Sequence, residues 1–120
     1  MVDISKIDMN RIEGLLDKLD SMTYIVETGN NENGWYRKWS DGWIEQGGEL
    51  ATVNMDTSNT VNIPIPFTTK TYNVLVTALG GKRNNTQYTN GNSVEGRELT
   101  FFVMRTDDYD FGRNWYACGY

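Results

Sequence analysis

The chain has 120 residues and a formal net charge of −5, so it suits one domain and offers no electrostatic basis for binding nucleic acid. It has no histidine and one cysteine, Cys118, which excludes Ser–His and Cys–His nucleophiles, imidazole metal ligands and an internal disulfide. No apolar run could span a bilayer and no signal-peptide pattern begins the sequence, so we expect no membrane insertion and no ordinary secretion. We also expect no cofactor.

Residues 3–22 have the pattern of an amphipathic helix that begins at an N-cap of Asp3 or Ser5. Apolar residues at alternating spacings of three and four form a coiled-coil seam, and a second seam overlaps the first. A stripe of that width favours three helices over two. The predicted trimer interface consists of Ile12, Leu15, Leu16, Leu19 and Met22. The alternative is a helix that lies on the sheet of its own domain.

A tryptophan-rich stretch at residues 35–48 predicts a β-hairpin, because Asp41-Gly42 between apolar-rich runs is a strong turn signal. A loop of these two residues places Trp39 opposite Ile44 on the neighbouring strand. An isolated hairpin is only marginally stable, so its aromatic faces need cover. We expect Trp39 and Ile44 to lie in the core.

The rest of the chain predicts short strands at near-regular spacing. They are expected at residues 24–28, 50–55, 60–67, 72–79, 99–106 and 114–120, with loops at 29–34 and 80–98. Pro64 and Pro66 lack amide hydrogens on one side of their strand, which is therefore expected at a sheet edge. The strand at 72–79 is apolar on both sides and is expected to be central. The pattern predicts a mainly β protein, with a coiled-coil stalk at residues 1–23 and an antiparallel β-sandwich head at residues 24–120.

Polar loops are the candidates for ligand binding. Those at 29–34, 80–98 and 107–113 supply amides, hydroxyls and aromatic rings, which suit saccharides or protein surfaces. The candidate ligand-binding residues are Arg83, Asn85, Gln87, Tyr88, Asn90, Asp108, Tyr109 and Arg113. We interpret the acidic residues at 107–110 as a solvated turn rather than as a metal site or a glycosidase pair.

The stretch from Trp35 to Gly48 resembles the WYRxxSDGWxEQGG signature of C-terminal head domains in phage and prophage tail-fibre proteins. The segments at 61–67, 72–74 and 115–120 follow in the order expected for that family. The resemblance implies a non-enzymatic, homotrimeric receptor-binding head at the tip of a virion fibre. It also implies that the partners are a bacterial surface receptor, expected to be a glycan, and other tail-fibre or baseplate proteins.

Two other functions fit the same residues. One is a structural connector whose aromatic faces bind another virion protein, and the other is a cellular carbohydrate-binding module. A monomer whose helix folds onto its own sheet would favour the module. The start of the helix directly after Met1 suggests either a fragment of a longer fibre or a small separate tip protein.

Overall fold

The computed structural model describes residues 9–51, 53, 57–78, 92–106 and 112–120. Within these residues the chain forms one α-helix and eight strands. They are α1 (Met9–Asp20), β1 (Ile25–Asn31), β2 (Gly34–Trp39), β3 (Ile44–Leu50), β4 (Ser58–Asn62), β5 (Asn73–Ala78), β6 (Asn92–Arg97), β7 (Phe101–Thr106) and β8 (Arg113–Gly119). No helix in the described ranges has the length and apolar character needed to cross a membrane.

The strands form two antiparallel sheets. The larger has the order β1-β2-β3-β8-β5 and the smaller has the order β4-β7-β6. Buried side chains from both sheets and from the connection after β4 meet in one core, which contains Ile44, Val61, Ile63, Phe67, Tyr72, Phe102, Met104, Trp115 and Ala117. The mainly β, antiparallel architecture is therefore confirmed, and so is the expected core face of Val61, Ile63 and Phe67.

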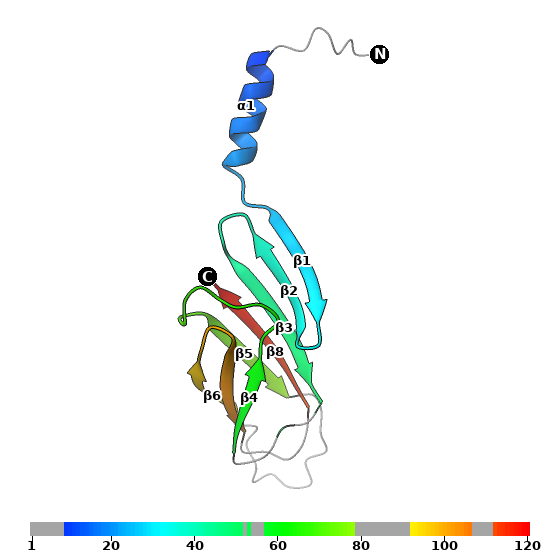
Figure 1. The fold of residues 1–120 in the computed structure, drawn as a ribbon, viewed down its shortest axis with the longest axis vertical. Helices are drawn as coiled ribbons and strands as arrows, with labels where there is room; N and C mark the ends of the chain where they lie inside the picture. Colours follow the sequence, from blue (N-terminus) through cyan, green and yellow to red (C-terminus); the bar gives the residue numbers. More distant parts are fainter. Residues whose placement is uncertain (1–8, 52, 54–56, 79–91, 107–111) are drawn as a thin grey trace.

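The helix α1 extends away from the strands along the long axis of the molecule (Figure 1). Its end is defined by Ser21, whose hydroxyl donates to the carbonyl of Lys18 at 2.8 Å. The chain then enters β1 through a pair of hydrogen bonds with the β2–β3 loop: Ser40 N donates to Tyr24 O at 2.7 Å, and Tyr24 N donates to Ser40 Oγ at 3.0 Å. The alternative of a helix lying on its own sheet does not match this arrangement.

The β2–β3 hairpin has a register one residue away from the expected one. Lys38, not Trp39, pairs with Ile44. The loop contains three residues, Ser40-Asp41-Gly42, and its glycine has a φ of 91°. It is closed by a hydrogen bond of 2.8 Å from Trp39 N to Trp43 O. Since a shift of one residue exchanges the faces of a strand, Ile44 is in the core as expected, but the prediction for Trp39 is wrong.

The predicted loop at 29–34 is instead a second tight hairpin. β1 continues to Asn31, which pairs with Gly34 across the turn. The two central residues of the turn are Glu32 and Asn33, and the glycine that follows them has a φ of 139°. Asn31 stabilises the turn in two ways, because its Oδ1 accepts from Asn33 N at 2.9 Å and its Nδ2 donates to Pro64 O at 3.0 Å.

Two strand positions also differ from the prediction. β5 lies at the edge of the larger sheet rather than at its centre, and the side chain of Leu75 is 65% exposed. The C-terminal part of the expected 80–98 loop forms β6, whereas residues 79–91 lie outside the described ranges. β4 is at the edge of the smaller sheet, as expected, although it ends before the two prolines.

In the connection between β4 and β5, every second backbone amide from residue 63 to residue 67 donates a hydrogen bond. The amides of Ile63 and Phe67 donate to backbone carbonyls in the turn between β6 and β7, at 3.1 and 2.9 Å. Midway between them, Ile65 N donates to Oε1 of Gln46 at 3.0 Å, and Nε2 of Gln46 donates to Ile65 O at 2.9 Å. The intervening residues are prolines, which have no amide hydrogen. Every backbone donor from 63 to 67 therefore has a partner, and the Gln46 side chain, fully buried in β3, supplies the central one.

Replacing Gln46 by leucine should strongly destabilise the head. The substitution leaves the amide and the carbonyl of Ile65 without partners, at about 1–3 kcal/mol for each group. We expect the free energy of unfolding, measured by urea titration, to fall by about 2–5 kcal/mol. Glu49→Leu, an exposed position on the same strand, is the matched control and should change it by less than about 0.5 kcal/mol. Equal stabilities of the two variants would contradict this role of Gln46.

Candidate functional site

Large apolar side chains are exposed along α1 and into the start of β1. Seven of them are 42–62% exposed, and we call this set the apolar stripe: Leu15, Leu16, Leu19, Met22, Tyr24, Ile25 and Val26. Soluble monomers rarely expose large apolar patches, and such patches usually mark interaction sites.

Four of the five predicted trimer-interface residues lie on one face of α1. Ile12, Leu15, Leu16 and Leu19 are separated by intervals of three, one and three, which keeps them on one side of a helix. Ile12 is half-buried, whereas the three leucines are exposed. Met22 lies beyond the end of α1, so the seam that was expected to continue through it is not helical at that position.

Four strand ends meet at the end of the head opposite α1, which we call the distal end (Figure 1). Ala78 at the end of β5 pairs with Arg113 at the start of β8. Asn92 at the start of β6 pairs with Thr106 at the end of β7. A hydrogen bond of 2.7 Å from Arg113 Nη2 to Thr106 Oγ1 joins the two sheets there. The two predicted binding loops after β5 and β7 therefore join the described strands at the same end of the molecule.

One of the eight candidate ligand-binding residues is among the described residues. Arg113 is fully buried, and its guanidinium donates to Thr106 and to the carbonyl of Gly112. This burial favours a structural role beneath the distal end. The other seven candidates lie outside the described residues: Arg83, Asn85, Gln87, Tyr88, Asn90, Asp108 and Tyr109.

The outer face of the larger sheet carries a hydrogen-bonded cluster that the sequence analysis missed. The carboxylate of Glu45 accepts from Trp39 Nε1 and from the hydroxyl of Tyr116, each at 2.7 Å. The hydrogen bond from Tyr116 is the main cause that lowers the pKa of Glu45, against a smaller opposing effect of burial. Burial, followed by the effect of Glu45, raises the pKa of Tyr116 well above its usual value. The wrong hairpin register concealed this cluster, because it placed Trp39 and Glu45 on opposite faces.

A second cluster lies beside the first, on the β1–β2 hairpin. The Trp35 ring is 6.1 Å from the Tyr116 ring and tilted by 42°, and the guanidinium carbon of Arg37 is 5.9 Å from the Trp35 ring centroid. Trp35 and Arg37 border a shallow pocket of about 280 Å³, which is lined by Thr28, Gly29, Asn30, Trp35, Tyr36 and Arg37.

The described side chains offer binding chemistry. In the described ranges, no three His, Cys, Asp or Glu side chains gather where they could hold a metal ion. Cys118 is half-buried in β8 with a free thiol. The side chains of the two clusters and of the pocket supply aromatic rings, a guanidinium, a carboxylate, hydroxyls and an amide, which stack and form hydrogen bonds.

Residues 38–120 match the sequence profile of a family described as tail fiber protein gp53-like, C-terminal. No curated protein shows significant sequence similarity to the chain. Among solved structures, the fold is similar to an N-truncated R2-type pyocin tail fiber, with a TM-score of 0.71 and 16% identity over 100% of this chain and 52% of that one. It is also similar to a C-terminal part of the P. aeruginosa R2 pyocin fiber, with a TM-score of 0.68 and 19% identity over 90% of this chain and 29% of that one.

At these low identities, the two structures show a likeness of the fold alone. The chain spans about half the length of the first of the two fibre structures.

The Glu45 cluster predicts a measurable pH dependence of stability. The pKa of Glu45 is lower in the folded chain than in the unfolded chain, where a glutamate has a pKa of about 4.3. Its stabilising contribution is therefore present above that pH and is lost as the pH falls through the folded-state pKa. Between about pH 6 and pH 3, Glu45→Gln should lose less unfolding free energy than the wild type. Glu49→Gln, on the same face of β3, should follow the wild type; identical profiles for all three proteins would contradict the prediction.

Proposed function

Because this chain belongs to the gp53-like tail fiber C-terminal family, we propose that it forms the tip of a phage-type tail fibre and attaches the particle to the bacterial surface without catalysis. The observation that carries the proposal is the polarity of the molecule. The apolar stripe begins on α1 at one end, and the strand ends that flank residues 79–91 and 107–111 meet at the other. Such a molecule can be anchored at one end while the opposite end faces a receptor.

The anchored form is proposed to be a homotrimer, with residues 1–23 as a coiled-coil stalk and residues 24–120 as a β-sandwich head. Twelve described residues of α1 make a helix of about 18 Å, and isolated helices of that size are marginal in water. The helix therefore needs a partner for its apolar face. The face of Ile12, Leu15, Leu16 and Leu19 is wider than a strict two-stranded seam, which supports three helices.

The receptor is proposed to be a saccharide of the bacterial surface, bound at the distal end. The proposed contacts are Arg83, Asn85, Gln87, Tyr88, Asn90, Asp108 and Tyr109. Their amides, charged groups and rings are the usual means of binding hydroxyl-rich ligands. The buried hydrogen bond between Arg113 and Thr106 supports this proposal, because it gives the two flanking strand pairs a common rigid base.

Leu19→Asp should dissociate the trimer, because an unpaired carboxylate in a buried apolar seam costs several kcal/mol. We expect the wild type to sediment as a trimer at micromolar concentration, and the variant to sediment as a monomer with its head still folded. Asp17→Lys makes a larger charge change on the opposite side of α1 and should leave the trimer intact. A monomeric wild type, or a trimer that survives Leu19→Asp, would refute the proposed interface.

Fluorescently labelled protein should stain intact cells of a susceptible strain. Tyr88→Ala and Tyr109→Ala should each reduce binding about tenfold, which corresponds to a contact worth about 1.4 kcal/mol, without lowering the melting temperature. Tyr120→Ala is the control, because it removes an exposed ring at the C-terminus, toward the α1 end of the head (Figure 1). Absence of staining across a broad panel of strains would instead favour a connector that binds other tail-fibre or baseplate proteins.

A further inference from the structure

We propose that the shallow pocket on the β1–β2 hairpin is a second ligand site, on the side of the head, which binds a carboxylate-bearing saccharide. This hairpin pocket is separate from the distal end and does not depend on the function proposed for it. The six residues that line it, from Thr28 to Arg37, all precede residue 38, where the match to the family profile begins.

Four side chains of the pocket form a square on the outer face of the sheet. Thr28 pairs with Arg37, and Asn30 pairs with Trp35, across the antiparallel strands. Residues opposite each other in such a ladder, and residues two apart along one strand, share a face. The volume of about 280 Å³ lies just below the usual range of roughly 300–1,000 Å³ for small-molecule sites. It suits one or two sugar rings rather than a folded partner.

Trp35 provides a rigid stacking surface in this square. Its side chain is 38% exposed, and the Tyr116 ring supports it from β8. A sugar ring can place its C–H face on an indole while its hydroxyl groups bind polar neighbours. The hydroxyl of Thr28 and the amide of Asn30 make no hydrogen bond to another described residue, so both are available to a ligand.

Arg37 gives the pocket its charge preference. Its guanidinium makes no ion pair with any described residue. The carboxylate across the ladder, Glu45, is already bound by Trp39 and Tyr116, and Arg37 affects the pKa of Glu45 less than either of those hydrogen bonds does. A guanidinium beside a stacking ring matches a sugar carboxylate, which it can bind through two parallel hydrogen bonds.

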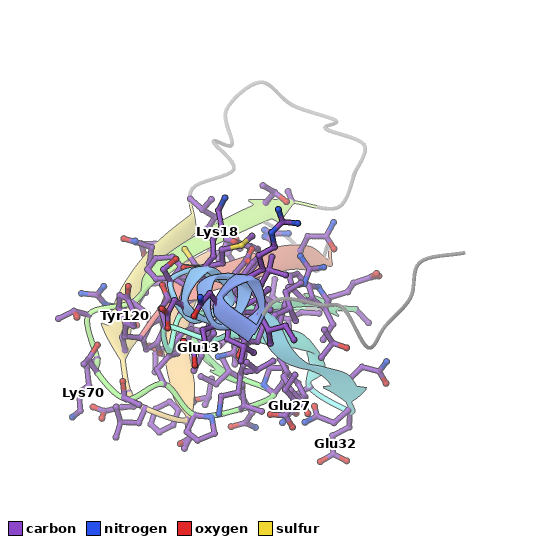
Figure 2. All side chains as sticks on the ribbon, turned by 90° about the horizontal axis from the view of Figure 1, so that it is seen from above. Glu13, Lys18, Glu27, Glu32, Lys70 and Tyr120 are labelled. Atoms are coloured by element: carbon purple, nitrogen blue, oxygen red, sulfur yellow. The ribbon has the colours of Figure 1, made fainter. Side chains whose placement is uncertain are left out.

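The acidic groups of the hairpin leave this pocket open to an anion. Glu27 lies on the opposite face of β1, where its carboxylate accepts from Tyr36 at 3.3 Å. Glu32 lies in the turn between β1 and β2, and its side chain is at the outer edge of the molecule in the view of Figure 2. Tyr36 also packs over Gly29, where an added Cβ would lie 2.6 Å from its ring. This contact lies on the opposite face of the hairpin, where the Tyr36 ring also reaches Glu27.

The test is an NMR titration of the full chain, following the indole N–H of Trp35. The probes are galacturonate, glucuronate and N-acetylneuraminate, with galactose as the neutral control. We expect at least one acidic sugar to shift this signal with millimolar affinity, at least about tenfold tighter than galactose. Arg37→Gln should weaken acidic-sugar binding at least about tenfold. Lys38→Gln, the same loss of charge one residue along on the other face, should not.

Three results would overturn the proposal: no acidic sugar binds, galactose binds as well as they do, or Arg37→Gln and Lys38→Gln behave alike. A change in sedimentation of Trp35→Ala would also overturn it, because the patch would then be a contact between subunits. The Tyr88→Ala and Tyr109→Ala variants should bind the acidic sugar as the wild type does. The hairpin pocket and the distal end can therefore fail independently.

Discussion

The side-chain amide of Gln46 joins parts of the head that no backbone ladder joins. Gln46 belongs to β3 of the larger sheet, and its partner Ile65 lies in the connection from the smaller sheet to β5. Prolines flank Ile65, so a strand could pair with this segment through one amide only. A buried glutamine supplies a donor and an acceptor at that one position. It thereby holds Ile63 and Phe67 at the depth where they close the core between the sheets.

The register of the β2–β3 hairpin could not be predicted from the sequence, although the hairpin itself could. Asp41-Gly42 correctly locates the turn, but the dipeptide fits a two-residue loop and also the end of a three-residue loop. The observed loop is supported locally by a hydrogen bond from Trp43 N to Asp41 Oδ1. It is also supported by the Glu45 cluster, whose member Tyr116 lies 71 residues further along the chain. The local sequence pattern contains no information about a partner so distant in the chain. The two strands could therefore be predicted, but the face on which each side chain lies could not.

The same limit explains the other differences. Alternation correctly identified the core face that includes Val61 and Phe67, because periodicity is a local property. Position within a sheet depends on neighbours. Leu75 makes β5 apolar on both sides, yet the residue is 65% exposed on an edge strand. For the candidate site, the sequence identified the apolar residues of α1, whereas the Trp35–Arg37 pocket appeared only when the correct pairing of β1 and β2 brought its four side chains onto one face.

A trimer would make three weak hairpin pockets useful. Surface polysaccharides repeat their units, so a head bound at one point meets further units at a high effective concentration, and avidity can exceed single-site affinity by about 10²–10⁴. The two parts of the pocket would respond differently to the medium. Salt weakens the attraction between charges at a protein surface, so Arg37 would contribute most in dilute media. Stacking on Trp35 is not screened by salt, and it would hold the sugar when the charge no longer does.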